Sequence, residues 1–300
     1  MKRDVIRRKA IEPKPNAEHD ADSRDGGVQS VDRALSIIET LAEDDEGYRL
    51  SDLAIRTGLS TSTVHRLLAT LEKRRFVQFD RYESKWHVGA QSFSVGATFA
   101  RRRNFVAQAM PYLRKLRDQT RETANLAVVD DESIIVLTRM ESREIMRSLT
   151  KVGGRVAMVA SGVGKAVLAT YSDEDVNAII HRQGMPRLTE KSIVRPGELF
   201  RELEAIRRQG YAVDDEEARM GLRCVAAVVY NDCSEPLAAI SVSGMTSRLT
   251  DDRLPALGRI VHEVAAELTV VLGGVLPVAA DEGSAKRGFG HSNSSTFSFR

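Results

Sequence analysis

A cluster of short polar side chains between Ser60 and Arg66 has the chemistry needed to contact DNA bases. Serine and threonine hydroxyls let a helix backbone approach a base edge, and the Arg66 guanidinium could pair with guanine. The residues concerned are Ser60, Thr61, Ser62, Thr63, His65 and Arg66. Cations that could neutralise phosphates follow at Lys73, Arg74, Arg75, Arg81 and Lys85. The alternative is a solvated basic face on a protein-docking domain, and the spacing favours DNA over it.

The distribution of charge agrees with contacts to phosphate in one part of the chain. The whole chain has a net charge of only +2, but residues 56–103 hold ten Lys and Arg against three acidic residues. The remainder is therefore net negative. Such asymmetry is expected when one domain meets nucleic acid and another does not.

A glycine-rich segment at Ser161-Gly162-Val163-Gly164-Lys165 could hold a small anion. It is not a nucleotide-binding phosphate loop, because the motif G-x-x-x-x-G-K-[ST] requires a glycine at Val159 and a hydroxyl at Ala166. Unpaired backbone N–H groups at a helix start can still bind a carboxylate. A serine-capped helix with glycines for close packing is an equally good interpretation.

A third set of polar groups lies in the predicted strands of the second half. Ser241 and Ser243 are two residues apart, so both hydroxyls lie on one side of a strand. Cys224 opens another strand and Asp214 ends a third. A buried hydroxyl needs a partner or a polar ligand. The residues alone nevertheless favour a solvent-facing row of serines and a packed thiol.

Other chemistry has little support in the sequence. There is no G-x-S-x-G, no H-E-x-x-H and no CxxC, and the six histidines are scattered. We therefore expect neither an enzyme, nor a metal site, nor a cofactor. With two cysteines, no apolar run of membrane-spanning length and no secretion signal at the first residues, a cytosolic protein is expected.

The elements that must position the first cluster form a winged helix-turn-helix. Apolar spacing predicts a helix over 31–41 capped by Ser30, a short helix over 50–58 capped by Ser51 and ended by Gly58, and a third helix capped by Ser60. The buried face of the first contains Val31, Ala34, Leu35, Ile38 and Leu41, and that of the third contains Val64, Leu67, Leu68 and Leu71. A hairpin over 76–88 follows.

With 300 residues the chain is long enough for a second domain. A helix from about 90 to 103 leads to alternating strands and helices, with short turns between neighbouring strands. We expect an antiparallel α+β sensor-like domain with its helices gathered on one side of the sheet. The composition at the two ends predicts a disordered arm and a disordered tail.

Several blocks in the same order resemble the IclR family of bacterial transcription regulators. They include 28–35, 57–68, 160–166, 207–214, 221–226 and 241–244, and the resemblance runs from Val28 to Gly273. It implies a DNA-binding winged helix-turn-helix (28–89), a linker helix that helps dimerise (90–104) and a GAF-like effector-binding domain (105–274). The arm then covers 1–27 and the tail 275–300. The family usually assembles as a dimer of dimers on a palindromic operator.

Members that sense glyoxylate or pyruvate are similar to this chain in an Asp, a Cys and an S-x-S pair. The resemblance therefore implies an effector site that contains Met146, Gly162, Val163, Asp214, Cys224, Ser241 and Ser243. The amides of Gly162 and Val163 would take a carboxylate, and Met146 would line an apolar wall. The sequence departs from the family pattern at Val156-Ala157-Met158, where a proline is common.

The expected protein is thus a cytosolic homotetrameric regulator. Its affinity for double-stranded operator DNA would change when a small oxo acid, glyoxylate above all, binds the second domain. One alternative is a sensor of an aromatic acid in the same family. The other is an enzyme or ligand-binding module whose winged helix docks protein.

Overall fold

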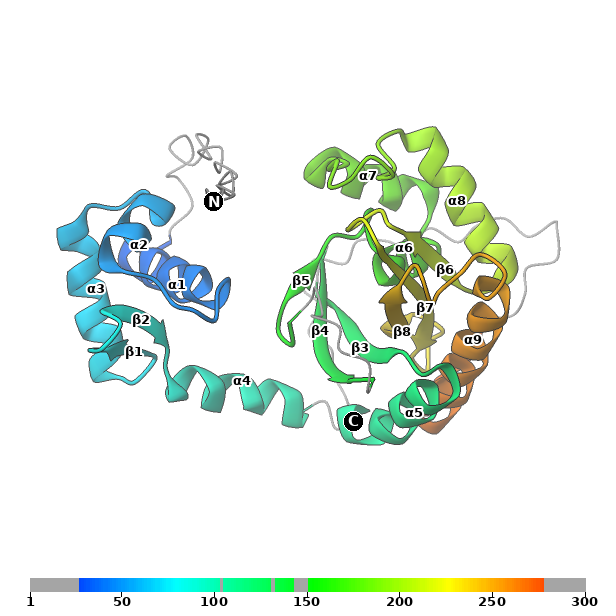
Figure 1. The fold of residues 1–300 in the computed structure, drawn as a ribbon, viewed down its shortest axis with the longest axis horizontal. Helices are drawn as coiled ribbons and strands as arrows, with labels where there is room; N and C mark the ends of the chain where they lie inside the picture. Colours follow the sequence, from blue (N-terminus) through cyan, green and yellow to red (C-terminus); the bar gives the residue numbers. More distant parts are fainter. Residues whose placement is uncertain (1–26, 103–104, 131–132, 143–150, 278–300) are drawn as a thin grey trace, which may run out of the picture. The chain divides into compact units, whose positions relative to one another are not determined.

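The computed structural model describes residues 27–102, 105–130, 133–142 and 151–277 (Figure 1). The chain forms two compact units that divide between Ala97 and Thr98, within helix α4 (Ala90–Arg102). The helix expected from about 90 to 103 is therefore present. Of the predicted arm and tail only Gly27 and residues 275–277 are described, and Met146 lies outside the described residues.

The first unit has the predicted order of elements. Helices α1 (Gln29–Ala42), α2 (Leu50–Thr57) and α3 (Thr61–Lys73) precede strands β1 (Val77–Asp80) and β2 (Lys85–Val88). The two strands pair antiparallel, with Val77 opposite Val88. The core contains Ile37, Leu41, Tyr48, Leu53, Val64, Leu68, Val77 and Trp86. This core fixes α3 with Val64 and Leu68 facing inward.

Two of the four predicted helix-end residues are in place. Ser60 caps α3, and Gly58 ends α2 in the left-handed conformation at φ 67°. The Ser30 and Ser51 caps were wrong, because α1 starts after Val28 and α2 after Arg49. Both serines are the second residue of their helix, so a serine near a helix start does not by itself fix the first helical residue.

The apolar face of α1 also differs from the prediction. Ile37 and Leu41 are buried, whereas Val31 and Leu35 are 54% and 53% exposed. The helix packs on α2 and α3 through its second half. Apolar spacing identified the helix and its buried second half, where Leu41 is buried and Ile38 packs against the core, but it wrongly extended the buried face to Val31 and Leu35.

The second unit is built on an antiparallel sheet. Within the described residues its six strands have the order β5-β4-β3-β8-β7-β6. Their bounds are β3 (Thr123–Asp130), β4 (Ser133–Met140), β5 (Arg155–Val156), β6 (Ala212–Asp215), β7 (Leu222–Tyr230) and β8 (Pro236–Met245). The helices are α5 (Phe105–Thr120), α6 (Gly162–Leu168), α7 (Asp173–Gln183), α8 (Pro196–Gln209) and α9 (Leu254–Val271). The α+β class is confirmed, and the GAF-like likeness stays a prediction.

Helices cover both faces of this sheet, so the expectation of helices on one side was wrong (Figure 1). Val225 and Val242 face a core shared with α5 and α9, whereas Ala226 and Ala239 face a core shared with α6, α7 and α8. A strand buried on both faces has apolar residues at successive positions, as β7 does. Such a strand does not alternate between apolar and polar residues, so the sequence pattern did not indicate that helices cover a second face of the sheet.

Among the described helices, none is long and apolar enough to cross a membrane.

Candidate functional site

The start of α3 presents the predicted hydroxyl cluster on the surface of the first unit. Ser60 Oγ accepts a hydrogen bond from the backbone N of Thr63 at 3.3 Å and lies 2.9 Å from Thr63 Oγ1 and 3.0 Å from Ser62 Oγ. Ser60, Thr61 and Ser62 are exposed and Thr63 is half-buried. The hydroxyls therefore satisfy one another while remaining accessible to a base edge.

As predicted, one side of α3 is buried and the opposite side is exposed. Val64 and Leu68 are fully buried, while His65 and Arg66 are exposed. A groove lies between α3 and the hairpin, and its lining includes Thr61 and His65 from the helix and Arg81 from the turn between the strands. A winged helix places this helix in the major groove and its wing beside the backbone of the duplex.

The residues predicted to contact phosphate differ in their solvent exposure and in whether a carboxylate already pairs with their charge. Lys73, Arg74, Arg75 and Arg81 are exposed around the end of α3 and the hairpin turn. Lys85 is half-buried, and its Nζ lies 3.4 Å from the carboxylate of Glu83. Lys85 is thus the weakest of the five candidates for a phosphate contact.

The second unit contains a cavity of about 240 Å³ at one face of the sheet. Its wall includes all the predicted effector residues that are described, namely Gly162, Val163, Asp214, Cys224, Ser241 and Ser243. The strand register brings them together, because Cys224 lies opposite both Asp214 and Ser243 in neighbouring strands. Residues opposite each other in an antiparallel pair share a face of the sheet.

The two serines face this cavity, so the favoured solvent-facing interpretation was wrong. Ser241 is only 2% exposed, and Val242 between them belongs to the core on the opposite face. Ser243 is half-buried, and helices pack on both faces of the sheet that contains β8. The serines therefore form a polar part of the cavity wall.

Asn125 is a wall residue that was not predicted. It lies opposite Ser241 in the pairing of β3 with β8, and its Nδ2 donates to Ser241 Oγ at 3.3 Å and to Ser243 Oγ at 3.2 Å. The amide thus orients both hydroxyls. The available signal was an asparagine in the otherwise apolar segment Ala124–Val129.

The start of α6 forms another wall. Ser161 Oγ accepts from the N of Gly164 at 3.1 Å, and the first backbone bond of the helix runs from Lys165 N to Ser161 O at 2.9 Å. The amides of Gly162 and Val163 therefore precede the bonded part of the helix. A side chain at Gly164 would collide with the Met158 backbone, so close packing also requires glycine. The two interpretations of the glycine-rich segment are compatible.

Asp214 lines the cavity and binds backbone amides of the turn that follows it. Its Oδ1 accepts from the backbone N of Glu217 at 2.8 Å and of Ala218 at 3.3 Å. Burial raises the pKa of its carboxyl, and these two bonds act against the increase. One oxygen of Asp214 thus holds the 215–218 turn in place.

Cys224 is expected to be a poor nucleophile. Burial, followed by the charge of Asp214, raises the pKa of its thiol to about 11. The thiolate is the reactive form, and very little of it exists at pH 7–8. In a Cys233→Ser variant, iodoacetamide should label Cys224 slowly, with a rate that rises about tenfold per pH unit to beyond pH 9. A rate that levels off near pH 8 would contradict this assignment.

Family models match both units. The model "IclR helix-turn-helix domain" matches residues 30–81, and the model "Bacterial transcriptional regulator IclR C-terminal" matches residues 97–270. The acetate operon repressor of Salmonella typhimurium is 42% identical over 251 residues, which cover 83% of this chain and 92% of that protein. The transcriptional repressor IclR of Escherichia coli strain K12 is 41% identical over 252 residues, with the same coverage of 83% and 92%.

Solved structures of the same architecture exist. The IclR transcriptional regulator from Alicyclobacillus acidocaldarius aligns with a TM-score of 0.71 at 25% identity, over 82% of this chain and all of that one. An IclR homologue from Microbacterium hydrocarbonoxydans, solved in complex with 4-hydroxybenzoate, aligns with a TM-score of 0.69 at 22% identity, over 81% and 99% of the two chains. At 22% identity, the similarity to the Microbacterium hydrocarbonoxydans protein shows a common fold alone.

Proposed function

This chain belongs to the IclR family of bacterial transcription regulators, and we propose that glyoxylate, bound in the cavity of the second unit, sets its affinity for operator DNA. It is a DNA-binding transcription regulator, and the relatives that it matches are named as repressors. Within that function, the effector, the residues that contact it and the assembly are our proposals.

One observation carries the choice of effector: the cavity combines helix-start amides with a row of hydrogen-bonding side chains. The amides of Gly162 and Val163 suit a carboxylate. The Ser241 and Ser243 hydroxyls, which also line the cavity, suit a carbonyl oxygen. A two-carbon oxo acid presents both groups at short separation. At about 240 Å³ the cavity is ample for a molecule of this size.

The apolar part of the lining favours a second candidate, an aromatic acid. Val136, Val156, Ala160 and Leu188 contribute to the same cavity, and a benzene ring would pack on such side chains. Calorimetry with glyoxylate, pyruvate and 4-hydroxybenzoate separates the candidates. Binding of 4-hydroxybenzoate without binding of glyoxylate would replace our proposal by this one.

The deciding experiment is a titration of operator DNA with and without glyoxylate, using DNA from upstream of the protein's own gene. The ligand must change operator affinity, because a ligand that binds both states equally shifts nothing. We expect a Cys224→Ala, Ser241→Ala double variant to bind operator normally but to lose the response. A wild-type response in that variant would defeat the glyoxylate assignment.

We further propose that the functional protein is a homodimer that pairs into a homotetramer, with α4 contributing to the contact between copies. A two-fold assembly matches a palindromic operator. Sedimentation of the purified protein tests the proposal, and a species that stays monomeric at micromolar concentration would contradict it.

Arg66→Ala is expected to weaken binding to operator by about 1 to 3 kcal/mol, with a smaller loss on random DNA, if its guanidinium pairs with a base edge. Fluorescence anisotropy on both duplexes at one salt concentration measures this difference. Arg56→Ala is the matched control, since Arg56 pairs with Glu43 at 3.3 Å and lies over the Tyr48 ring. Equal losses on the two duplexes would make Arg66 a phosphate contact.

A further inference from the structure

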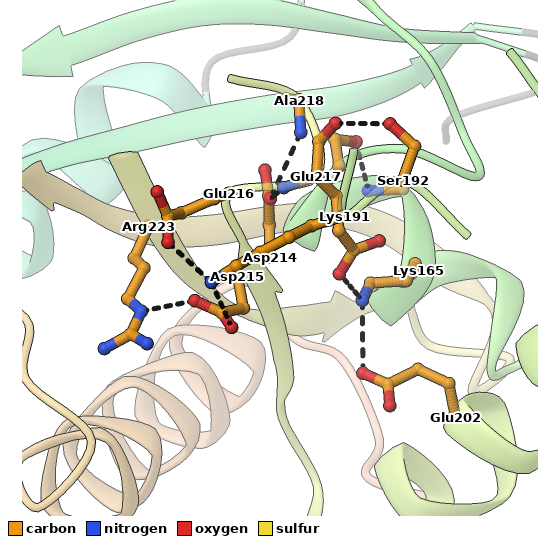
Figure 2. A network of polar contacts seen from close by, with 12 residues as sticks. Lys165, Lys191, Ser192, Glu202, Asp214, Asp215, Glu216, Glu217, Ala218 and Arg223 are labelled. Carbon is orange, nitrogen blue, oxygen red and sulfur yellow. Dashed lines mark hydrogen bonds and ion pairs between the residues drawn. The ribbon is translucent and has the colours of Figure 1, made fainter. Parts of the chain in front are cut away.

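A fully buried ammonium group lies beside the effector cavity and takes no part in the function proposed above. Lys165, on α6, is 0% exposed. Its Nζ lies 2.5 Å from Glu217 Oε1 and 3.1 Å from Glu202 Oε1, as Figure 2 shows. A buried charge is tolerated only when it is paired, and removing one partner of a buried pair is strongly destabilising. The two carboxylates are therefore bound firmly to this lysine.

Glu217 connects this lysine to the wall of the cavity. Its backbone N donates to Asp214 Oδ1 at 2.8 Å, and its backbone O accepts from Ser192 Oγ at 2.8 Å (Figure 2). The next two residues, Ala218 and Arg219, line the cavity. A single residue thus links α6, the segment around Ser192 and the cavity rim.

The turn that contains Glu217 is costly to hold in this form. Four successive carboxylates occupy positions 214–217, and like charges so close repel one another. Glu216 also has a left-handed backbone at φ 63°, which side chains other than glycine rarely adopt. Such a conformation persists only where its surroundings fix it.

Each of these carboxylates has at least one polar partner, and Lys191 pairs with both Asp215 and Glu216. Asp215 accepts from Arg223 Nε at 2.5 Å in a half-buried contact, and Glu216 accepts from Lys191 Nζ at 2.6 Å at the surface. Asp214 and Glu217 are both buried, but only Glu217 pairs with Lys165, and its Oε2 is buried with no hydrogen-bond partner among the described residues. Burial raises the pKa of Glu217 to about 6, against the effect of Lys165. Without the Lys165 ammonium, no ion pair would stabilise the Glu217 carboxylate in its buried position.

We propose that the Lys165–Glu217 pair is a positioning element of the effector cavity, which holds the 214–219 turn against α6 so that two walls of the cavity keep their spacing. Where it concerns the ligand, the proposal rests on the proposed function. Lys165 and Glu217 are positioning residues, and neither lines the cavity. Glu202 pairs with the same ammonium from α8, at 3.1 Å.

Hydrogen exchange at the amides of Glu217 and Ala218 tests the pair without any ligand, because both amides donate to Asp214. We expect Glu217→Ala to raise their exchange rate at least tenfold. This variant should fold, since Lys165 keeps Glu202 as a partner. Lys165→Met should have the same effect. Glu202→Ala is the matched control and should stay within twofold of the wild type.

Exchange within twofold of the wild type in Glu217→Ala would overturn the proposal, as would an equal increase in Glu202→Ala. Calorimetry adds the ligand: Lys165→Met should bind glyoxylate at least tenfold more weakly, and Glu202→Ala should bind it normally. Unchanged affinity in Lys165→Met would overturn the link to the cavity. If the wild type itself binds no glyoxylate, the proposed effector fails, and the exchange rates still decide whether the pair positions the turn.

Discussion

Replacing Gly162 with valine is expected to weaken the response to effector, while operator binding without effector stays normal. A Cβ atom at this position would lie 3.2 Å from both the Sγ and the carbonyl oxygen of Cys224. That contact is already tight, and the two further methyl groups of valine would extend into the cavity or push α6 away from β7. Overpacking of this kind costs about 1 to 3 kcal/mol, or roughly 5- to 150-fold in affinity.

Calorimetry with glyoxylate and anisotropy with operator DNA measure the two properties separately. Gly197→Val is the matched control, because a Cβ at Gly197, in the first turn of α8, would meet nothing within 4 Å. This control should bind glyoxylate as the wild type does. Normal glyoxylate affinity in Gly162→Val would show that the effector does not lie against the start of α6.

The first unit was predictable because its signals are local. The Ser60 cap, the left-handed Gly58 and the apolar spacing of Val64 and Leu68 all act within a few residues of one another. The wrong caps at Ser30 and Ser51 show the limit of such signals. A serine near a helix start is compatible with several starting positions that differ by one or two residues.

The cavity depended on contacts between distant residues. Asp214, Cys224 and Ser243 meet through the register of β6, β7 and β8, which spacing along the chain cannot supply. Their common site was implied by the family resemblance and not by their positions. Asn125 and the pairing of Lys165 with Glu217 were missed for the same reason, since each joins segments at least 52 residues apart.

Replacing Leu68 with alanine is expected to remove operator binding at 37 °C while glyoxylate binding persists. Leu68 is 0% exposed and packs in a core formed entirely by the first unit. Truncation of a buried leucine costs about 2 to 5 kcal/mol, because it loses buried apolar area and leaves a cavity. A unit of this size has only a few kcal/mol of stability, so the loss is enough to unfold it. The effector cavity rests on separate cores in the second unit.

The single tryptophan of the chain makes this expectation measurable. Trp86 is 9% exposed in the core of the first unit, so the change of its fluorescence with temperature reports the unfolding of that unit alone. Ile55→Ala is the control, since Ile55 is 80% exposed on α2 and its truncation should leave the midpoint nearly unchanged. A midpoint equally unchanged in Leu68→Ala would contradict the assigned core. Loss of glyoxylate binding together with operator binding would show that the two units do not fold independently, because a defect confined to the first core should leave the second able to bind its ligand.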